Sequence, residues 1–154
     1  IRDRIRCLEF RRVLFRSAPF FNSIFDDFSH LLLKNYQNLS ELNKTLILFF
    51  CRGFDIDREF YNSSDLRLSS LNEQKIFDTC SLLEGKVYFS GTGAKAYQEE
   101  ANFAEAGLLL KYSDFKLFGY RQLWGKEFLG NVSILDYVMN CGFDWDRVLE
   151  HQIS

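Results

Sequence analysis

Eight residues are candidates for ligand binding because they follow predicted strands or lie in an aromatic loop. They are Ser64, Asp65, Ser90, Gly91, Gly93, Tyr97, Tyr120 and Gln122. In open α/β sheets, ligands bind beyond the carboxyl ends of the strands, where polar side chains gather. Exposed amides at the start of a following helix favour an anionic group. These positions therefore predict a site for a small molecule.

The turn Ser90-Gly-Thr-Gly93 is the clearest of these features. Val87, Tyr88 and Phe89 are typical of a half-buried strand, and the glycines then mark a sharp turn before a helix. The spacing matches neither the dinucleotide-binding fingerprint nor the P-loop, because Lys95 does not complete a GxxxxGK pattern. Two interpretations follow: the turn binds a ligand, or its glycines only close a tight connection.

Two other segments allow a similar choice. Residues 62–65 offer hydroxyls and a carboxylate to a ligand, yet such groups commonly close Asx and ST turns on their own backbone. The aromatic segment 118–128 contains Tyr120, Gln122 and Trp124. An aromatic loop suits stacking on a sugar or base, and it equally suits covering the edge of a sheet.

The sequence contains no recognisable metal or cofactor motif. Its four cysteines are far apart and form no C-x-x-C pair, which is typical of thiols in a reducing compartment. With only two histidines, a zinc site is not expected. No Ser-His-Asp order and no paired-carboxylate motif is present after residue 17, so the sequence leaves open whether the protein is an enzyme. We expect no cofactor and a cytoplasmic location.

Charge and hydropathy exclude two classes of partner. The 154 residues have a formal net charge of −2 and no basic stripe, which argues against nucleic acid, because phosphate binding needs clustered Lys and Arg. The longest apolar runs, such as residues 45–51, are much shorter than the ~20 residues that a membrane span needs. We expect a soluble protein rich in aromatic residues, with 17 Phe and seven Tyr. The sequence does not define the oligomeric state.

Residues 1–17 differ in composition from the rest of the chain. They contain six Arg and no Lys, and Leu8-Glu-Phe-Arg-Arg-Val-Leu-Phe-Arg-Ser17 looks like the in-frame translation of a sequencing-library adapter. A basic amphipathic arm is the alternative. We expect a non-native segment at 1–17 that packs poorly, and a native segment at 18–154. Without residues 1–17 the chain keeps 13 basic and 19 acidic residues, a net charge of −6.

Hydrophobic periodicity and capping residues predict an α/β fold. The predicted helices cover residues 19–35, 40–53, 70–85, 97–106 and 133–142, and a short terminal helix starts at Asp144. The predicted strands cover residues 56–61, 87–89 and 108–112. Ser40 and Ser133 are the expected N-caps of their helices, and Ser70 with Glu73 is expected to form a capping box.

Consecutive strand–helix–strand passages require a parallel sheet with right-handed crossovers. We therefore expect a short, mostly parallel sheet flanked by helices. The strand ends near Ser64 and Ser90 are predicted to lie side by side. Asp65, Gly91, Gly93 and Tyr97 would then surround a shared cleft.

Several short segments occur in an order and spacing that is specific in combination. They are Ala18-Pro-Phe-Phe21, Asn62-Ser-Ser-Asp-Leu66, Tyr88-Phe-Ser-Gly91 followed by Tyr97, Tyr120-Arg-Gln122 with Phe128, and Ser133-Ile-Leu-Asp136 with Asn140-Cys-Gly142. Together they resemble the WbqC-like proteins, which are found with genes for O-antigen and other bacterial surface polysaccharides. The resemblance covers residues 18–154, the later part of the family domain. It implies a truncated larger α/β domain that lacks an N-terminal His-Gln-Pro segment and a region rich in Asp, His and Arg.

Two functions are consistent with this resemblance. The first is an enzyme of surface-polysaccharide biosynthesis, such as a transferase acting on a nucleotide-linked sugar. The second is a non-catalytic binding or assembly protein of the same pathway, with its aromatic surface as the interface. A nucleotide-linked sugar or another small molecule is the expected ligand.

Overall fold

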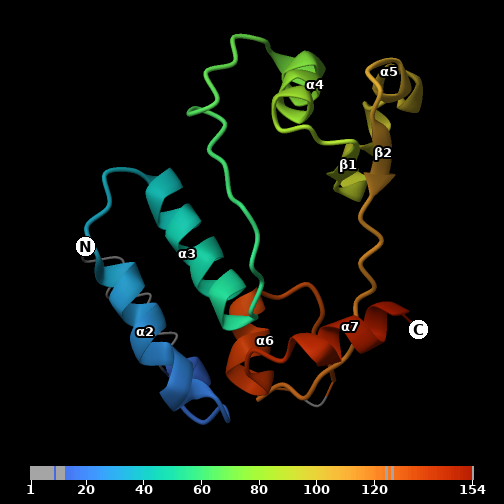
Figure 1. The fold of residues 1–154 in the computed structure, drawn as a ribbon. Helices are drawn as coiled ribbons and strands as arrows, with labels where there is room; N and C mark the ends of the chain where they lie inside the picture. The colour runs from blue at the N-terminus through green and yellow to red at the C-terminus, as the bar shows by residue number, and fades with distance from the viewer. Residues whose placement is uncertain (1–8, 10–12, 124, 126, 154) are drawn as a thin grey trace. The chain divides into compact units, whose positions relative to one another are not determined.

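The computed structural model describes residues 9, 13–123, 125 and 127–153, and its elements are shown in Figure 1. In chain order they are α2 (Phe21–Leu33), α3 (Leu39–Gly53), α4 (Asn72–Leu82), β1 (Val87–Ser90), the 3₁₀ helix η1 (Thr92–Ala96), α5 (Glu100–Glu105), β2 (Leu109–Tyr112), α6 (Ile134–Cys141) and α7 (Trp145–Ile153). The chain divides into two compact units. Unit 1 contains the residues up to Asp57 and those from Lys116 onward, and unit 2 runs from Arg58 to Phe115.

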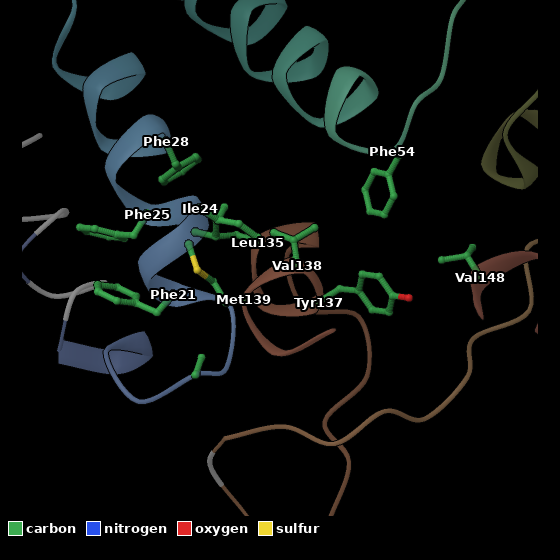
Figure 2. Close-up of a cluster of buried hydrophobic side chains, with 11 residues drawn as sticks. Phe21, Ile24, Phe25, Phe28, Phe54, Leu135, Tyr137, Val138, Met139 and Val148 are labelled. Atoms are coloured by element: carbon green, nitrogen blue, oxygen red, sulfur yellow. The ribbon is translucent and has the colours of Figure 1, made fainter. Parts of the chain in front are cut away.

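The core of unit 1 forms where α2 packs against α6. Apolar residues of α2 recur at helical spacing, so that they lie on one face of the helix. Figure 2 shows Ile24 beside Leu135 and Met139 of α6, whereas the rings of Phe21 and Phe25 lie on the other side of α2 in this view. The buried core side chains of the two helices are Phe21, Ile24, Phe25 and Phe28 from α2, and Leu135, Tyr137, Val138 and Met139 from α6.

Both ends of α6 are defined by short-range interactions. Ser133 Oγ accepts a hydrogen bond from the Leu135 amide at 3.3 Å, which confirms the predicted N-cap. Gly142 ends the helix at φ 77°, a left-handed conformation that favours glycine. A Cβ at this position would lie 2.8 Å from the ring of Phe20, so the glycine also allows a close approach of α2 to α6.

Unit 2 contains the two-stranded sheet, in which β1 and β2 are parallel with Tyr88 opposite Leu110. The α5 helix lies between the two strands in the chain, as the crossover of a parallel pair requires. Phe103 on α5 is fully buried, and Leu108 and Leu110 are buried beside it with 8% exposure each. The structure therefore confirms an α/β fold with a short parallel sheet.

The predicted strand at 56–61 is wrong. These residues have no strand conformation, and the sheet of the described chain contains β1 and β2. The Ile56 amide instead donates to the Cys51 carbonyl at 2.8 Å, as part of the turn that follows α3. A weak alternation of apolar and polar residues does not produce a strand where the segment has no neighbouring strand to pair with.

Three helix starts also differ from the predictions. Asn38, not Ser40, caps α3, because its Oδ1 accepts from the Glu41 amide at 3.0 Å. The capping box at Ser70 does not form, and α4 begins at Asn72 without a side-chain cap. Glu73 accepts instead from the Asn102 side-chain amide at 2.9 Å, a tertiary contact that competes with local capping. The helix predicted at 97–106 begins only at Glu100, as α5, and the 3₁₀ helix η1 precedes it.

Most of the segment 1–17 lies outside the described residues. Of the remainder, Val13 is 62% exposed, whereas Phe15 is half-buried and packs against the core of unit 1. The origin of this segment stays a prediction. Among the described residues, none of the helices is long and apolar enough to cross a bilayer.

We predict that Phe103→Ala strongly destabilises unit 2. Removing a fully buried Phe costs about 3–5 kcal/mol, which is a large share of the about 5–15 kcal/mol that stabilises a domain. The matched control is Phe89→Ala in the same unit, because Phe89 is 67% exposed and its loss should cost under about 1 kcal/mol. Urea unfolding and hydrogen exchange of the β1 and β2 amides measure the difference. Equal effects of the two substitutions would contradict this description of the core.

Candidate functional site

The candidate site is a groove on α4 that consists of two adjoining cavities of unit 2. The first, called the polar cavity, has a volume of about 400 Å³ and is lined by Asn72, Glu73, Ile76, Tyr97 and Gln98. It brings the first turns of α4 together with the segment that follows η1. Its lining thus combines amide and carboxylate groups with an aromatic ring.

The second cavity, called the apolar cavity, has a volume of about 330 Å³. Its lining residues are Ser63, Asn72, Lys75, Ile76, Thr79, Cys80 and Tyr88. Asn72 and Ile76 line both cavities, so the two cavities adjoin along α4. Each volume is within the range of small-molecule sites, about 300–1,000 Å³. The groove therefore offers two chemically different compartments to one ligand.

Local structure fixes the polar side chains of the groove. Glu73 is held by the Asn102 side-chain amide at 2.9 Å, which joins α4 to α5. Asn72 has φ 52°, a left-handed conformation that asparagine tolerates better than most residues. Tyr97 is 75% exposed, although its amide donates to the Ala94 carbonyl at 3.1 Å. A fixed carboxylate thus shares the polar cavity with an accessible aromatic ring.

Gln98 has an unusual environment in the polar cavity. Its side-chain Oε1 is buried and has no hydrogen-bond partner among the described residues. A buried acceptor without a partner costs about 1–3 kcal/mol, so most such groups in proteins are paired. Gln98 is consequently the residue of the groove with an unsatisfied requirement for a donor.

Cys80 in the apolar cavity is not an activated nucleophile. Burial raises the pKa of its thiol, because a thiolate is poorly solvated there. The protonated thiol dominates at neutral pH and reacts slowly. Among the described residues, there is also no group of three His, Cys, Asp or Glu side chains that could hold a metal ion.

The structure places the predicted residues of unit 2 in three settings. Tyr97 lines the polar cavity. Ser64 and Asp65 belong to a local turn, in which Asp65 accepts from the Asn62 side chain at 2.6 Å and from Ser64 Oγ at 3.2 Å. Ser63, next to Ser64, lines the apolar cavity. Ser90 is the buried last residue of β1, and its carbonyl accepts from the Ser113 amide at 2.8 Å.

The turn after β1 does not require its glycines. Gly91 has φ −72°, and a Cβ at Gly91 or Gly93 would meet no atom within 4 Å. The following helix is η1, a 3₁₀ segment of five residues rather than a full α-helix. The predicted anion site at this turn stays a prediction, although so short a helix has little dipole to support it. The space above the two glycines is open.

Tyr120 and Gln122 belong to unit 1, where they form a network with Asp136 of α6. Tyr120 Oη and Gln122 Nε2 donate to the same Asp136 oxygen, at 2.8 and 3.0 Å. Gln122 also pairs in both directions with the backbone of Leu129. Burial, and then the bond to Asp136, raises the pKa of Tyr120, so its phenol remains a donor. These contacts hold the aromatic segment on α6.

The sequence interpretation missed Asp136, Glu73 and Gln98. Glu73 was expected only to form a local capping box with Ser70. Glu73 and Asp136 bind residues of another segment, and Gln98 is distinguished by an unpaired acceptor. Local spacing gives no signal for either property. A polar residue at a half-buried position was the only available indication.

Fold and groove define a class: an α/β chain with a ligand-sized groove beside a parallel strand pair, and without a metal cluster in its described part. The family model of the WbqC-like protein family matches residues 4–147. The chain therefore belongs to the WbqC-like protein family.

One curated relative is the uncharacterized protein Rv1507c of Mycobacterium tuberculosis (strain ATCC 25618 / H37Rv), 32% identical over 139 residues. The alignment covers 89% of this chain and 58% of the relative, so the chain spans somewhat more than half the length of that protein. No solved structure matches the chain.

We predict that the Tyr120 network makes the free energy of unfolding depend on pH in alkaline solution. Burial raises the pKa of Tyr137 to about 12, and the pKa of Tyr120 is also raised. The unfolded chain ionises its tyrosines near pH ~10, before the folded chain does, so the free energy of unfolding falls as pH rises above ~10. Tyr120→Phe should lower that free energy by about 0.5–1.5 kcal/mol at pH 7 and reduce the alkaline slope.

Urea unfolding at pH 7, 10 and 11 measures both effects. The control is Tyr97→Phe, since Tyr97 is 75% exposed and its replacement should leave stability and slope unchanged. An unchanged alkaline slope in Tyr120→Phe would show that this phenol ionises as readily in the folded protein as in the unfolded chain.

Proposed function

We propose that the protein acts in the biosynthesis of O-antigen or another bacterial surface polysaccharide, and that its α4 groove binds a nucleotide-linked sugar as the substrate of a transferase. Family membership supports the pathway, because WbqC-like proteins are found with genes for such polysaccharides. The observation that carries the ligand class is the pair of adjoining cavities with different linings. A nucleotide-linked sugar has a matching division into a flat base and a polar glycosyl unit.

The groove accommodates the two ends of this ligand differently. The apolar cavity, between Ile76, Cys80 and Tyr88, suits a base. Lys75 lines the same cavity and supplies a cation near which a diphosphate is stabilised. The polar cavity suits the sugar, because its amides and carboxylate form hydrogen bonds and Tyr97 offers a ring face.

Positioning would provide most of the catalysis in such a transferase. Cys80 is protonated, and the groove contains no nucleophile next to a histidine. Holding two substrates in the right geometry converts a bimolecular reaction into an effectively unimolecular one. Glu73 is the carboxylate available for proton transfer, and Asn102 orients it. In this proposal, the other predicted ligand residues of unit 2 either support the groove or contact a part of the ligand that extends beyond it. They are Ser64, Asp65, Ser90, Gly91 and Gly93.

A non-catalytic binding or assembly role in the same pathway is the second candidate. The observation that favours it is the apolar surface of the sheet in unit 2, where Val87, Phe89 and Leu109 are 43%, 67% and 53% exposed. Exposed apolar groups of this size are typical of protein interfaces. Transfer of the sugar to an acceptor separates the two candidates, since only the enzyme releases a free nucleotide.

We predict that Tyr97→Ala weakens the binding of uridine-diphosphate and thymidine-diphosphate sugars about threefold to tenfold. This factor corresponds to the loss of ring stacking, about 0.5–1.5 kcal/mol. The control is Tyr61→Ala, because Tyr61 is 54% exposed in the same unit but does not line the two cavities. Isothermal titration calorimetry measures the affinities. Failure of every nucleotide-linked sugar to bind the full chain would refute the proposed ligand.

We further propose that residues 1–17 are adapter-derived and that residues 18–154 correspond to the C-terminal part of a cytoplasmic WbqC-like domain. The adapter-like residues 8–17 support the first statement, whereas the family match, which begins at residue 4, is an observation against it. The 58% coverage of the mycobacterial relative is consistent with a partial domain. Sequencing the genomic DNA upstream of the Ala18 codon tests the proposal. We expect adapter bases in the original read and different codons in the genome; a continuous genomic sequence that encodes residues 1–17 would disprove it.

A further inference from the structure

The polar cavity combines two acceptors, a carboxylate and a buried amide oxygen without a partner, with the amide donors of Asn72 and Gln98 and the Tyr97 phenol. Glu73 contributes a carboxylate, one of whose oxygens is used by Asn102. Gln98 contributes a buried Oε1 without a partner among the described residues. The residues that line this cavity include no Lys, Arg or His. A ligand group that brings hydrogen-bond donors therefore suits the two open acceptors.

We propose that the polar cavity is a subsite for the hydroxyl or amino groups of a sugar ring, and that Gln98 and Glu73 determine its specificity. The subsite deepens the proposed function, on which it rests for the attached nucleotide. Sugar hydroxyls donate hydrogen bonds to Gln98 Oε1 and to the Glu73 carboxylate. They thereby provide partners for acceptors that the protein leaves unpaired. An ammonium group on the sugar gains additionally from the negative charge of Glu73.

The same chemistry disfavours phosphate in the polar cavity. Phosphate oxygens are acceptors with negative charge, so beside Glu73 they would be repelled and would leave Gln98 Oε1 unpaired. Lys75 lines the apolar cavity and not the polar one. A nucleotide-linked sugar is thereby oriented in the groove, with its glycosyl end toward Tyr97 and its diphosphate toward Lys75.

Gln98 reaches the ligand by a movement of its own side chain. Oε1 is buried, but the residue forms part of the cavity wall. Rotation about its terminal bond, which is soft for an amide, turns the oxygen toward an incoming hydroxyl. The rotation breaks no hydrogen bond of Oε1, because the oxygen has none to lose among the described residues.

The first experiment follows the side-chain amide of Gln98 by NMR in the full chain. The signal that is missing from the spectrum of Gln98→Met identifies this amide. We expect it to shift on titration with methyl glucoside and with glucosamine, but not with inorganic pyrophosphate. The proposal is overturned if pyrophosphate shifts it or if neither sugar does.

Two variants test the specificity. Gln98→Met keeps the volume of the side chain but removes the acceptor, so methyl glucoside should bind about threefold to tenfold more weakly. Gln98→Glu keeps an acceptor and adds a charge, so the preference for glucosamine over methyl glucoside should increase about threefold or more. Equal affinities of Gln98→Met and the unchanged protein for methyl glucoside would contradict the assigned role. Urea unfolding of both variants confirms that they are folded.

A comparison of free and nucleotide-linked sugar separates this proposal from the proposed function. If methyl glucoside binds at Gln98 but uridine diphosphate glucose binds no more tightly, the sugar subsite stands and the nucleotide-linked substrate is wrong. If uridine diphosphate glucose binds without moving the Gln98 signal, the substrate class stands and the sugar subsite is wrong.

Discussion

The groove depends on the burial of one aromatic ring, Phe103. This side chain is fully buried on α5, and its ring lies 5.1 Å from that of Phe77 on α4 and 5.6 Å from that of Tyr88 on β1. Three elements of unit 2 are therefore held at fixed separations by one side chain. Both cavities have walls on α4, and their opposite walls come from β1 or from the segment between η1 and α5. A shift of Phe103 would change both compartments together.

The sequence predicts the parts of the fold in which local pattern and tertiary packing agree. The apolar stretches around Tyr88 and Leu110 are strands in the structure, and the helix between them makes the pair parallel. Ser133 caps α6 because its hydroxyl meets an amide two residues later, which requires no distant partner. The segment 56–61 shows the limit of such patterns. Alternation indicates a strand only if a neighbouring strand supplies hydrogen bonds, and here the backbone continues the turn after α3.

The site was only partly predictable because its polar groups act across elements. Tyr97 could be found, since it follows a glycine-marked turn after a strand. Glu73 was expected to form a capping box, but a side-chain amide 29 residues away binds it instead. Gln98 has no recognisable sequence pattern, because the lack of a partner for its acceptor depends on which residues surround it in space. Spacing along one helix or strand contains none of this information.

Two segments that support the family resemblance bind each other, so their polar residues have a structural role that requires no ligand. Tyr120 and Gln122 come from one of these segments and Asp136 from the other, and both donors meet one carboxylate oxygen. Gln122 is used further by the backbone of Leu129. These side chains would lose several hydrogen bonds on binding a substrate. The loss would leave buried polar groups without partners, which costs free energy. Gln98 has no such competing partner among the described residues. We therefore assign ligand recognition to the groove of unit 2 rather than to the aromatic segment of unit 1.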